Sequence, residues 1–357
     1  MRKPLMKIFL LCCFFSLIVG MRSSTYAQQS PQANEKERGI ELYRKGDFSE
    51  AVKTLKVAVK KQQGDIEAWY YLGLSLHGAG KIKDARKTFE KTLSLNPDFA
   101  RGYAAMAYMQ LLGDDNKGAV KNAEKALTLD PKSVESLYIA GMAHLREGAP
   151  AVALARAEDA LKIKPDYPEA FILKTQALIN MFSQSRANLS KSPGRFEEGK
   201  ATGEANGEVR KRSDYSLLKE ASESLDAYLK LTPDQSEQAL WREQLEGLRI
   251  YARMAPESNP DTSVTRMTPT LRPTILSREK ARYTDAARNA GVRGTVVLMV
   301  VFADDGVVKH ILAIQPLSHG LTEEAIRAAR EIRFTPAIRD GKPISVIGML
   351  EFTFNMY

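Results

Sequence analysis

The chain has few of the residues that sulfur chemistry requires. It contains two cysteines, Cys12 and Cys13, and both lie inside one apolar run close to the N-terminus. If this run is removed on export, no cysteine remains. Disulfide bonds, cysteine nucleophiles and thiolate metal sites are then all excluded.

The chain also has little that resembles a membrane span. The apolar run from Ile8 to Met21 holds 14 uncharged residues, whereas a spanning helix needs about 20. Basic residues precede the run, and the small residues of Thr25-Tyr26-Ala27 follow it. This layout predicts a secretory signal peptide over residues 1–27, with cleavage between Ala27 and Gln28. The alternative is a retained membrane anchor.

Recognisable catalytic motifs are missing too. The four histidines have no metal-ligand spacing, and no GxSxG, HExxH or phosphate-binding loop is present. The net charge of +9 is not gathered into a basic stripe with interleaved aromatic residues, which argues against nucleic-acid binding. We therefore expect no enzymatic activity, no cofactor and no metal, and we expect proteins as partners.

The first half of the chain is instead rich in repetition. Small residues and prolines recur every 34 residues, at Ala51, Ala85, Ala119, Ala153, Pro97, Pro131 and Pro165. Together with Trp69 in "WYYLGLSLHGAG" and Phe89, this pattern resembles the tetratricopeptide repeat (TPR). The units lie at 32–65, 66–99, 100–133 and 134–167. Each unit is expected to form two amphipathic helices that stack on their neighbours in an all-α solenoid with a concave surface.

A fifth repeat looks interrupted. Its helix A completes a repeat region over 32–182, and its helix B and a capping helix fall in 214–253. Between them, residues 183–213 are rich in Ser, Gly and charge with almost no apolar periodicity, which predicts a disordered insertion. Residues 254–270 hold three prolines and several small polar residues and are typical of a linker.

The TPR resemblance also predicts a peptide-binding groove. In such repeats, positions 2, 5, 9 and 12 of helix A usually face the concave side. Those positions include Tyr43, Glu67, Tyr70, Leu74, His77, Arg101, Tyr108, Glu135, Tyr138 and Met142. Tyrosine suits a peptide groove because it combines rigid contact area with a hydroxyl group. The alternative is that some of these side chains only pack between neighbouring A helices.

From residue 271 the pattern changes to strands. The β-branched run "GTVVLMVVFA" and the run "VVKHILAIQP" flank Asp305-Gly306, which predicts a hairpin. The segment "LTEEAIRAAREI" predicts a helix, with Thr322 as N-cap and an apolar stripe of Leu321, Ala325, Ala328 and Ile332. After the turn at Asp340-Gly341, residues 344–354 predict a last strand.

These residues resemble the TonB C-terminal domain over 271–357. The matching elements occur in order: Tyr283 with Ala286-Ala287, Gly294-Thr295-Val296, Asp305-Gly306, Leu321 with Ala325, Phe334-Thr335-Pro336-Ala337, Gly341-Lys342-Pro343, Phe352 and Phe354. Thr284 departs from the family pattern, which has proline after the tyrosine. The resemblance implies a small α+β domain, an antiparallel sheet with helices on one face. The predicted fold class is therefore multidomain, an all-α TPR solenoid followed by this domain.

The resemblance further implies a binding mode. Domains of this family lie in the periplasm and capture an extended peptide of an outer-membrane transporter by adding it as a strand to the sheet edge. We expect the last strand to be that edge, with partner contacts at Ile344, Val346, Ile347, Met349, Leu350 and Phe352. The alternative is an edge that is blocked or that pairs with a second copy.

The sequence thus predicts a periplasmic, non-enzymatic adaptor. Its TPR groove would hold one protein, and its C-terminal domain would engage a TonB-dependent outer-membrane transport system. Two alternatives stay open at this point. One is an inner-membrane-anchored, TonB-type energy transducer that faces the periplasm, and the other is a structural scaffold that dimerises through the tail domain.

Overall fold

The computed structural model describes residues 33–191, 203–233, 238–253 and 270–355. The chain divides into two compact units, one up to Ala170 and the other from Phe171. The predicted signal peptide, with its cleavage site between Ala27 and Gln28, lies outside the described residues. The predicted linker lies outside them as well, apart from Thr270.

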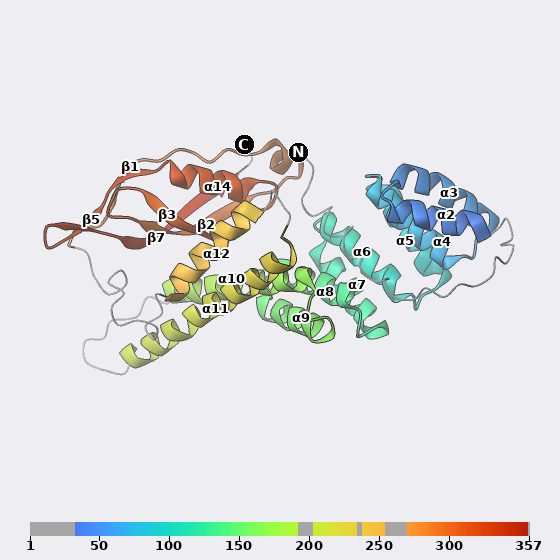
Figure 1. The fold of residues 1–357 in the computed structure, drawn as a ribbon, viewed down its shortest axis with the longest axis horizontal. Coiled ribbons are helices and arrows are strands. Elements are labelled where there is room, and N and C mark those ends of the chain that lie inside the picture. The colour runs from blue at the N-terminus through green and yellow to red at the C-terminus, as the bar shows by residue number, and fades with distance from the viewer. Residues whose placement is uncertain (1–32, 192–202, 234–237, 254–269, 356–357) are drawn as a thin grey trace. The chain divides into compact units, whose positions relative to one another are not determined.

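The first unit consists of helix pairs that repeat with the period of the sequence (Figure 1). The helices are α2 (Ala33–Arg44), α3 (Phe48–Lys61), α4 (Ile66–Gly78), α5 (Ile82–Leu95), α6 (Ala100–Leu112), α7 (Asn116–Leu129), α8 (Val134–Arg146) and α9 (Pro150–Ile163). The even-numbered helices are the A helices of the repeats, and the odd-numbered helices are the B helices. The predicted all-α repeat array is confirmed.

Small residues allow the two helices of a pair to approach closely. The four alanines with the 34-residue spacing, Ala51, Ala85, Ala119 and Ala153, are all fully buried. At Gly73 on α4, a Cβ atom would lie 2.5 Å from the ring of the fully buried Phe89 on α5. Only glycine therefore fits at that position without displacement of the ring.

Polar side chains fix several helix starts. Asp65, Asp115 and Ser133 each accept a hydrogen bond from a backbone N–H in the first turn of α4, α7 and α8. Such caps satisfy N–H groups that have no partner within the helix, and each stabilises the fold by about 1 kcal/mol. The other described starts from α3 to α9 have no side-chain cap, so packing of the apolar stripes carries the repeat period.

Three helices precede the C-terminal domain. They are α10 (Pro168–Lys191), α11 (Gly203–Leu231) and α12 (Gln238–Arg253). The hydroxyl of Ser224 on α11 donates to the carbonyl of Phe171 on α10 over 2.9 Å, and Arg249 on α12 pairs with Asp226 on α11 over 2.8 Å. The helix B and capping helix expected in 214–253 correspond to α11 and α12.

The insertion expected at 183–213 needs a correction. α10 continues to Lys191 and α11 begins at Gly203, so helix occupies both ends of that segment, and only 192–202 lie outside the described residues. The physical reason is that extension of an existing helix adds one hydrogen bond for each residue fixed, without a new nucleus. Residues without an apolar pattern therefore continue a helix whose neighbouring turns are packed.

The C-terminal domain is built on a three-stranded antiparallel sheet with the order β3-β2-β7. Its strands are β2 (Gly294–Phe302), β3 (Val308–Gln315) and β7 (Val346–Phe354). Two short ladders accompany it, β1 (Thr274–Ser277) with β4 (Arg333–Thr335), and β5 (Ala337–Arg339) with β6 (Lys342–Ile344). The helices are α13 (Asp285–Asn289) and α14 (Leu321–Arg330). The predicted β2–β3 hairpin turns at Gly306, whose φ is 81°.

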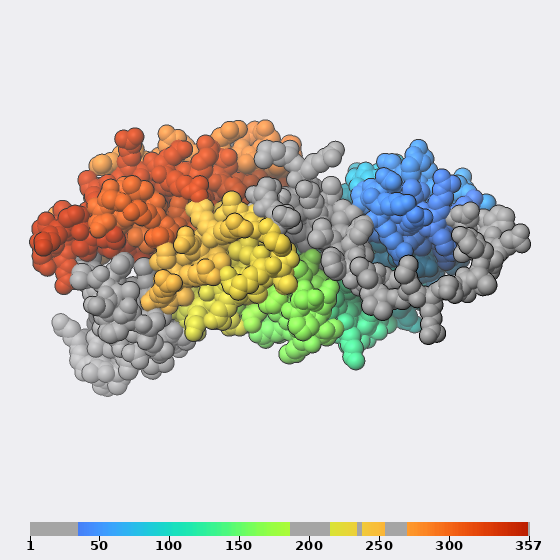
Figure 2. All heavy atoms as spheres, in the orientation of Figure 1, coloured from blue at the N-terminus to red at the C-terminus, as the bar shows by residue number. Residues whose placement is uncertain are grey.

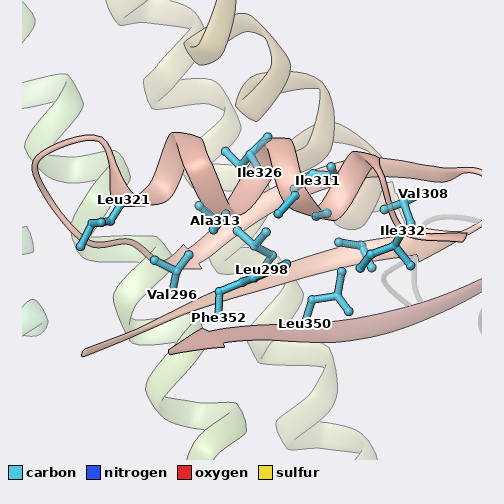
Figure 3. Packing of buried hydrophobic residues seen from close by; sticks show 14 of the residues in the cluster. Val296, Leu298, Val308, Ile311, Ala313, Leu321, Ile326, Ile332, Leu350 and Phe352 are labelled. Atoms are coloured by element: carbon cyan, nitrogen blue, oxygen red, sulfur yellow. The ribbon is translucent and has the colours of Figure 1, made fainter. Parts of the chain in front are cut away.

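Helix α14 covers one face of the sheet, as Figure 3 shows. The predicted stripe of Leu321, Ala325, Ala328 and Ile332 is buried. Alternate residues of β2 meet it: Val296, Leu298, Val300 and Phe302. Because side chains alternate along a strand, the intervening residues belong to the opposite face. This arrangement agrees with the predicted α+β class.

The helix starts differ in detail from expectation. Gly320, with φ 81°, precedes α14 in the N-cap position, and Thr322 lies in the first turn instead. The Thr322 hydroxyl bonds both the N–H and the carbonyl of Leu317, which holds the preceding loop. Thr284 is the N-cap of α13: its side chain accepts from the N–H of Ala287 and donates to the carbonyl of His319. The residue that departs from the family pattern therefore has a local role.

Candidate functional site

The outer edge of β7 is the candidate site of the C-terminal domain. β7 is the terminal strand of the sheet and pairs with β2 in unbroken register, from Gly294 opposite Phe354 to Phe302 opposite Val346. Among the described strands, none pairs with its other edge. This edge therefore presents backbone N–H and C=O groups to a further strand.

The register identifies the residues of β7 that point outward. Gln315 of β3 donates its side-chain amide to the carbonyl of Thr295 over 3.0 Å, so the backbone groups of Thr295 face β3. Thr295 lies opposite Thr353, and such alternation continues along an antiparallel ladder. The β7 residues of the same parity therefore direct their N–H and C=O away from β2. They are Ile347, Met349, Glu351 and Thr353.

Arg278 lies beside this edge. Its guanidinium donates to the carbonyl of Glu351, which agrees with the outward orientation of that group. Its Cζ also lies 4.4 Å from the centre of the Phe352 ring, a cation–π distance. The arginine is exposed, so an incoming strand would compete with it for a single acceptor.

The six residues expected at the strand edge lie in three different locations in the domain. Ile344 lies in β6 opposite Ala337, so the last strand is shorter than expected and Ile344 belongs to the β5–β6 hairpin. Val346, Leu350 and Phe352 point into the core under α14. Ile347 and Met349 lie on the opposite face, where Met349 is 42% exposed. Contact of these residues with a partner stays a prediction.

Half of the ten residues expected in the TPR groove are buried. Tyr43, Leu74, His77, Tyr108 and Tyr138 are at most 9% exposed. Their rings pack between helices: His77 meets Tyr108 edge-on at 5.5 Å, and Tyr43 meets Tyr71 at 5.6 Å. Such contacts give the A helices a rigid lining. Contact of these side chains with a bound peptide stays a prediction.

Other predicted groove residues are more accessible. Tyr70 and Met142 are half-buried, and Arg101, Glu67 and Glu135 are exposed. The Arg101 guanidinium lies 5.2 Å from the ring centres of both Tyr70 and Phe99. Sequence reasoning missed Phe99, because it precedes α6 rather than occupying a groove position on it. Binding of a peptide by this set stays a prediction.

The described residues contain no group of three or more His, Cys, Asp and Glu side chains placed to hold a metal ion. His144 on α8 bonds Glu124 on α7 through Nε2 and Oε1 over 2.9 Å, and Arg156 on α9 binds the same carboxylate. That cluster joins three consecutive helices and is structural. None of the helices in the described part of the chain is long and apolar enough to cross a membrane.

Comparison with known families agrees with this division of the chain. The family described as "Gram-negative bacterial TonB protein C-terminal" matches residues 279–356. The tetratricopeptide repeat family matches residues 36–111 and 112–168. The two tetratricopeptide matches lie within the helical repeats, and the TonB match covers β2, β3 and β7.

Two curated proteins are similar to part of this chain. Hsp70-Hsp90 organizing protein 3 of Arabidopsis thaliana is 25% identical over 117 residues, 33% of this chain and 21% of that protein. Hsp70-Hsp90 organizing protein of Triticum aestivum is 24% identical over 103 residues, 29% of this chain and 18% of that protein. The chain thus spans about a fifth of the length of these curated relatives.

Two solved structures illustrate the similarity of this chain to known folds. A thermophilic TPR protein of Thermus thermophilus is 16% identical, with a TM-score of 0.43, and the match covers 61% of this chain and 99% of that one. The MamA protein is 18% identical, with a TM-score of 0.40, and the match covers 56% of this chain and 94% of that one.

The fold and its two surfaces define a protein-interaction protein, a helical repeat array followed by a small domain with an open strand edge. More specifically, this chain carries tetratricopeptide repeats and a TonB C-terminal domain. Domains of both families are typically non-catalytic and have protein partners. The TonB domain indicates a protein of the Gram-negative cell envelope.

Proposed function

We propose that this chain is a non-enzymatic adaptor in the periplasm. Its TPR array holds one protein, and its C-terminal domain takes an extended segment of a TonB-dependent outer-membrane transport system as an added strand on β7. The observation that carries the proposal is the row of outward backbone groups at Ile347, Met349, Glu351 and Thr353.

Strand addition suits this edge for a physical reason. Backbone hydrogen bonds supply affinity for any extended peptide, while alternate side chains of the peptide supply selectivity. One set of those side chains would lie beside Ile347 and Met349, on the face that α14 does not cover. The exposed thioether of Met349 is flexible and polarisable, and it adapts to different apolar partners.

The repeat array supports the second half of the proposal. Its buried aromatic residues hold the A helices firmly, and Tyr70, Arg101 and Met142 remain accessible along them. A surface on which an aromatic ring and a cation are held together, as in Tyr70 and Arg101, favours an extended protein segment over a small polar ligand, because little side-chain entropy is lost on binding.

Peptide binding tests the adaptor proposal. The probes are synthetic 12-residue peptides that cover the periplasm-facing N-terminal segments of the outer-membrane transporters encoded in the same genome. Met349→Pro removes one outward N–H, which the β2 ladder does not use, and should weaken peptide binding by tenfold or more (about 1.4 kcal/mol). Met349→Thr keeps that N–H and is the matched control, whose affinity should stay within about threefold of wild type.

Two results would count against strand addition. One is equal affinity of the proline variant and wild type, and the other is absence of binding by wild type to every peptide. Circular dichroism shows whether the proline variant is folded. Fluorescence anisotropy with labelled peptides gives the affinities.

The compartment is tested separately. The intact mass of the protein from a Gram-negative host should begin at Gln28 and appear in the soluble periplasmic fraction. A full-length mass in the inner-membrane fraction would contradict the adaptor proposal. It would favour the alternative of an inner-membrane-anchored energy transducer.

A further inference from the structure

β3 is the second edge of the sheet, and helix α12 covers it. In the order β3-β2-β7, both terminal strands have one side without a strand partner. Yet α12 packs closely along β3, and the yellow atoms of that helix meet the orange and red atoms of the domain in Figure 2. The β3 edge of the sheet is therefore covered by a helix, whereas the β7 edge has no strand partner among the described strands.

Gln244 of α12 takes the place of a strand residue. Its side-chain amide donates to the carbonyl of Ile311 over 3.1 Å, and its Oε1 accepts from the N–H of Ala313 over 2.9 Å. These are the two groups that one residue of a neighbouring parallel strand would bind. Gln244 is 6% exposed, so water does not replace it readily.

Tyr251 closes the next position along β3. Its fully buried side chain donates its hydroxyl to the carbonyl of His310 over 2.7 Å. His310 has φ 51°, and the ladder between β2 and β3 shifts register beside it. This bulge turns the carbonyl toward α12. Burial raises the pKa of the Tyr251 hydroxyl, so that it remains a donor at every physiological pH.

Two further features hold α12 close to the strand. Gly247 faces Leu312, and a Cβ atom at that glycine would lie 3.5 Å from the Leu312 Cβ. Glu243, one turn before, pairs with Arg330 of α14. The helix is thus fixed to the strand edge and to the covering helix of the same domain.

We infer that α12 is an edge-closing helix, which prevents a second copy of this chain from pairing with β3 and leaves the sheet one open edge. Exposed strand edges pair readily with other chains, so each edge needs either a partner or a cover. The inference requires no transporter and stands apart from the proposed function, because its first readout is association of the chain with itself.

Removal of the two polar contacts tests the inference. In the full chain, Gln244→Ala with Tyr251→Phe leaves the β3 groups at 310, 311 and 313 unpaired. We expect a larger, concentration-dependent mass by light scattering than for wild type at equal concentration. Hydrogen exchange at the Ala313 amide should also rise at least tenfold. Glu246→Ala, an exposed position on the same helix, is the control and should change neither quantity. Unchanged mass and unchanged exchange in the double variant would overturn the inference.

A cross-link keeps the test decisive if the double variant is poorly folded. Gly247→Cys with Leu312→Cys places two Cβ atoms about 3.5 Å apart, within the range of about 3.5–4.5 Å found in disulfides. Oxidation should join residues 247 and 312, as peptide mapping by mass spectrometry shows. Added to the double variant, the cross-link should suppress the extra association, and a reductant should restore it. Failure of the cross-link to form, or equal association with and without it, would overturn the inference.

Discussion

The repeat array and the C-terminal domain differ in the sequence distance that their contacts bridge. In the array, each helix packs mainly on its neighbours along the chain, such as α4 on α5 and α6 on α7. In the C-terminal domain, Val297 pairs with Glu351, and the ring of Phe302 lies 4.8 Å from that of Phe334. A stack of local contacts is stabilised step by step, whereas a sheet closed by distant strands forms only as a whole.

The largest test of this difference removes one buried ring from each region. Phe89→Ala in the array and Phe334→Ala in the domain should each lower the free energy of unfolding by about 3–5 kcal/mol. The array variant should lose hydrogen-exchange protection mainly in α4, α5 and the adjacent helices. The domain variant should lose it in all three strands together.

Hydrogen exchange with mass spectrometry measures both patterns on the full chain. If Phe89→Ala lowered hydrogen-exchange protection equally across the whole array, the array would not be stabilised by local contacts alone. If Phe334→Ala lowered protection only in β4, the three-stranded sheet would not unfold as one cooperative unit.

A smaller test uses glycines that are crowded in both regions. A Cβ at Gly73 would lie 2.5 Å from the Phe89 ring, and one at Gly348 would lie 2.4 Å from the Phe302 ring. Gly73→Ala and Gly348→Ala should each destabilise by about 1–3 kcal/mol, because a packed ring must move. Nothing lies within 4 Å of the Cβ position at Gly64, so Gly64→Ala should change stability by less than about 0.5 kcal/mol. Urea denaturation measures all three, and equal effects would show that crowding is not the cause.

The smallest effect concerns the two ion pairs of Asp226, one with Lys230 on the same helix α11 and one with Arg249 on α12. The side chain of Lys230 and then that of Arg249 hold the pKa of Asp226 below its ordinary value. Because the folded-state pKa is the lower one, the carboxylate stabilises the fold above about pH 4, and the contribution is lost as the pH falls through the folded-state value. Asp226→Asn should lower stability at pH 7 by less than about 1 kcal/mol. The difference from wild type should vanish on acidification, and a difference that grows instead would contradict the assignment.

The array could be predicted from the sequence because its packing is periodic. Each close approach of helices requires a small residue, so Ala51, Ala85, Ala119 and Ala153 record the period directly. Burial of individual side chains was harder to predict. Tyr108 and Tyr138 sit at groove positions, but their exposure depends on neighbouring helices such as α4, which contributes His77 against Tyr108.

The sheet could be predicted from its family pattern, but its boundaries could not. The last strand breaks at Ser345, whose hydroxyl accepts from the N–H of Asp304 in the distant β2–β3 turn. The residues around Ser345 give no indication of this long-range hydrogen bond. The packing of α12 on β3 could not be predicted for the same reason. It depends on a hydrogen bond from the Gln244 side chain to the carbonyl of Ile311, 67 positions later, and no sequence motif marks this glutamine.

The uneven ladders of the sheet have a mechanical consequence. β2 pairs with β7 in unbroken register, whereas its ladder with β3 shifts register at two places. A pulling force applied between a peptide strand bound to β7 and helix α12 on β3 would act first on the β7–β2 ladder and then on the β2–β3 ladder. A continuous row of hydrogen bonds distributes such a force over all its bonds, whereas a bulge leaves fewer bonds to resist it. The β2–β3 ladder is therefore the part of the sheet that should yield first under force.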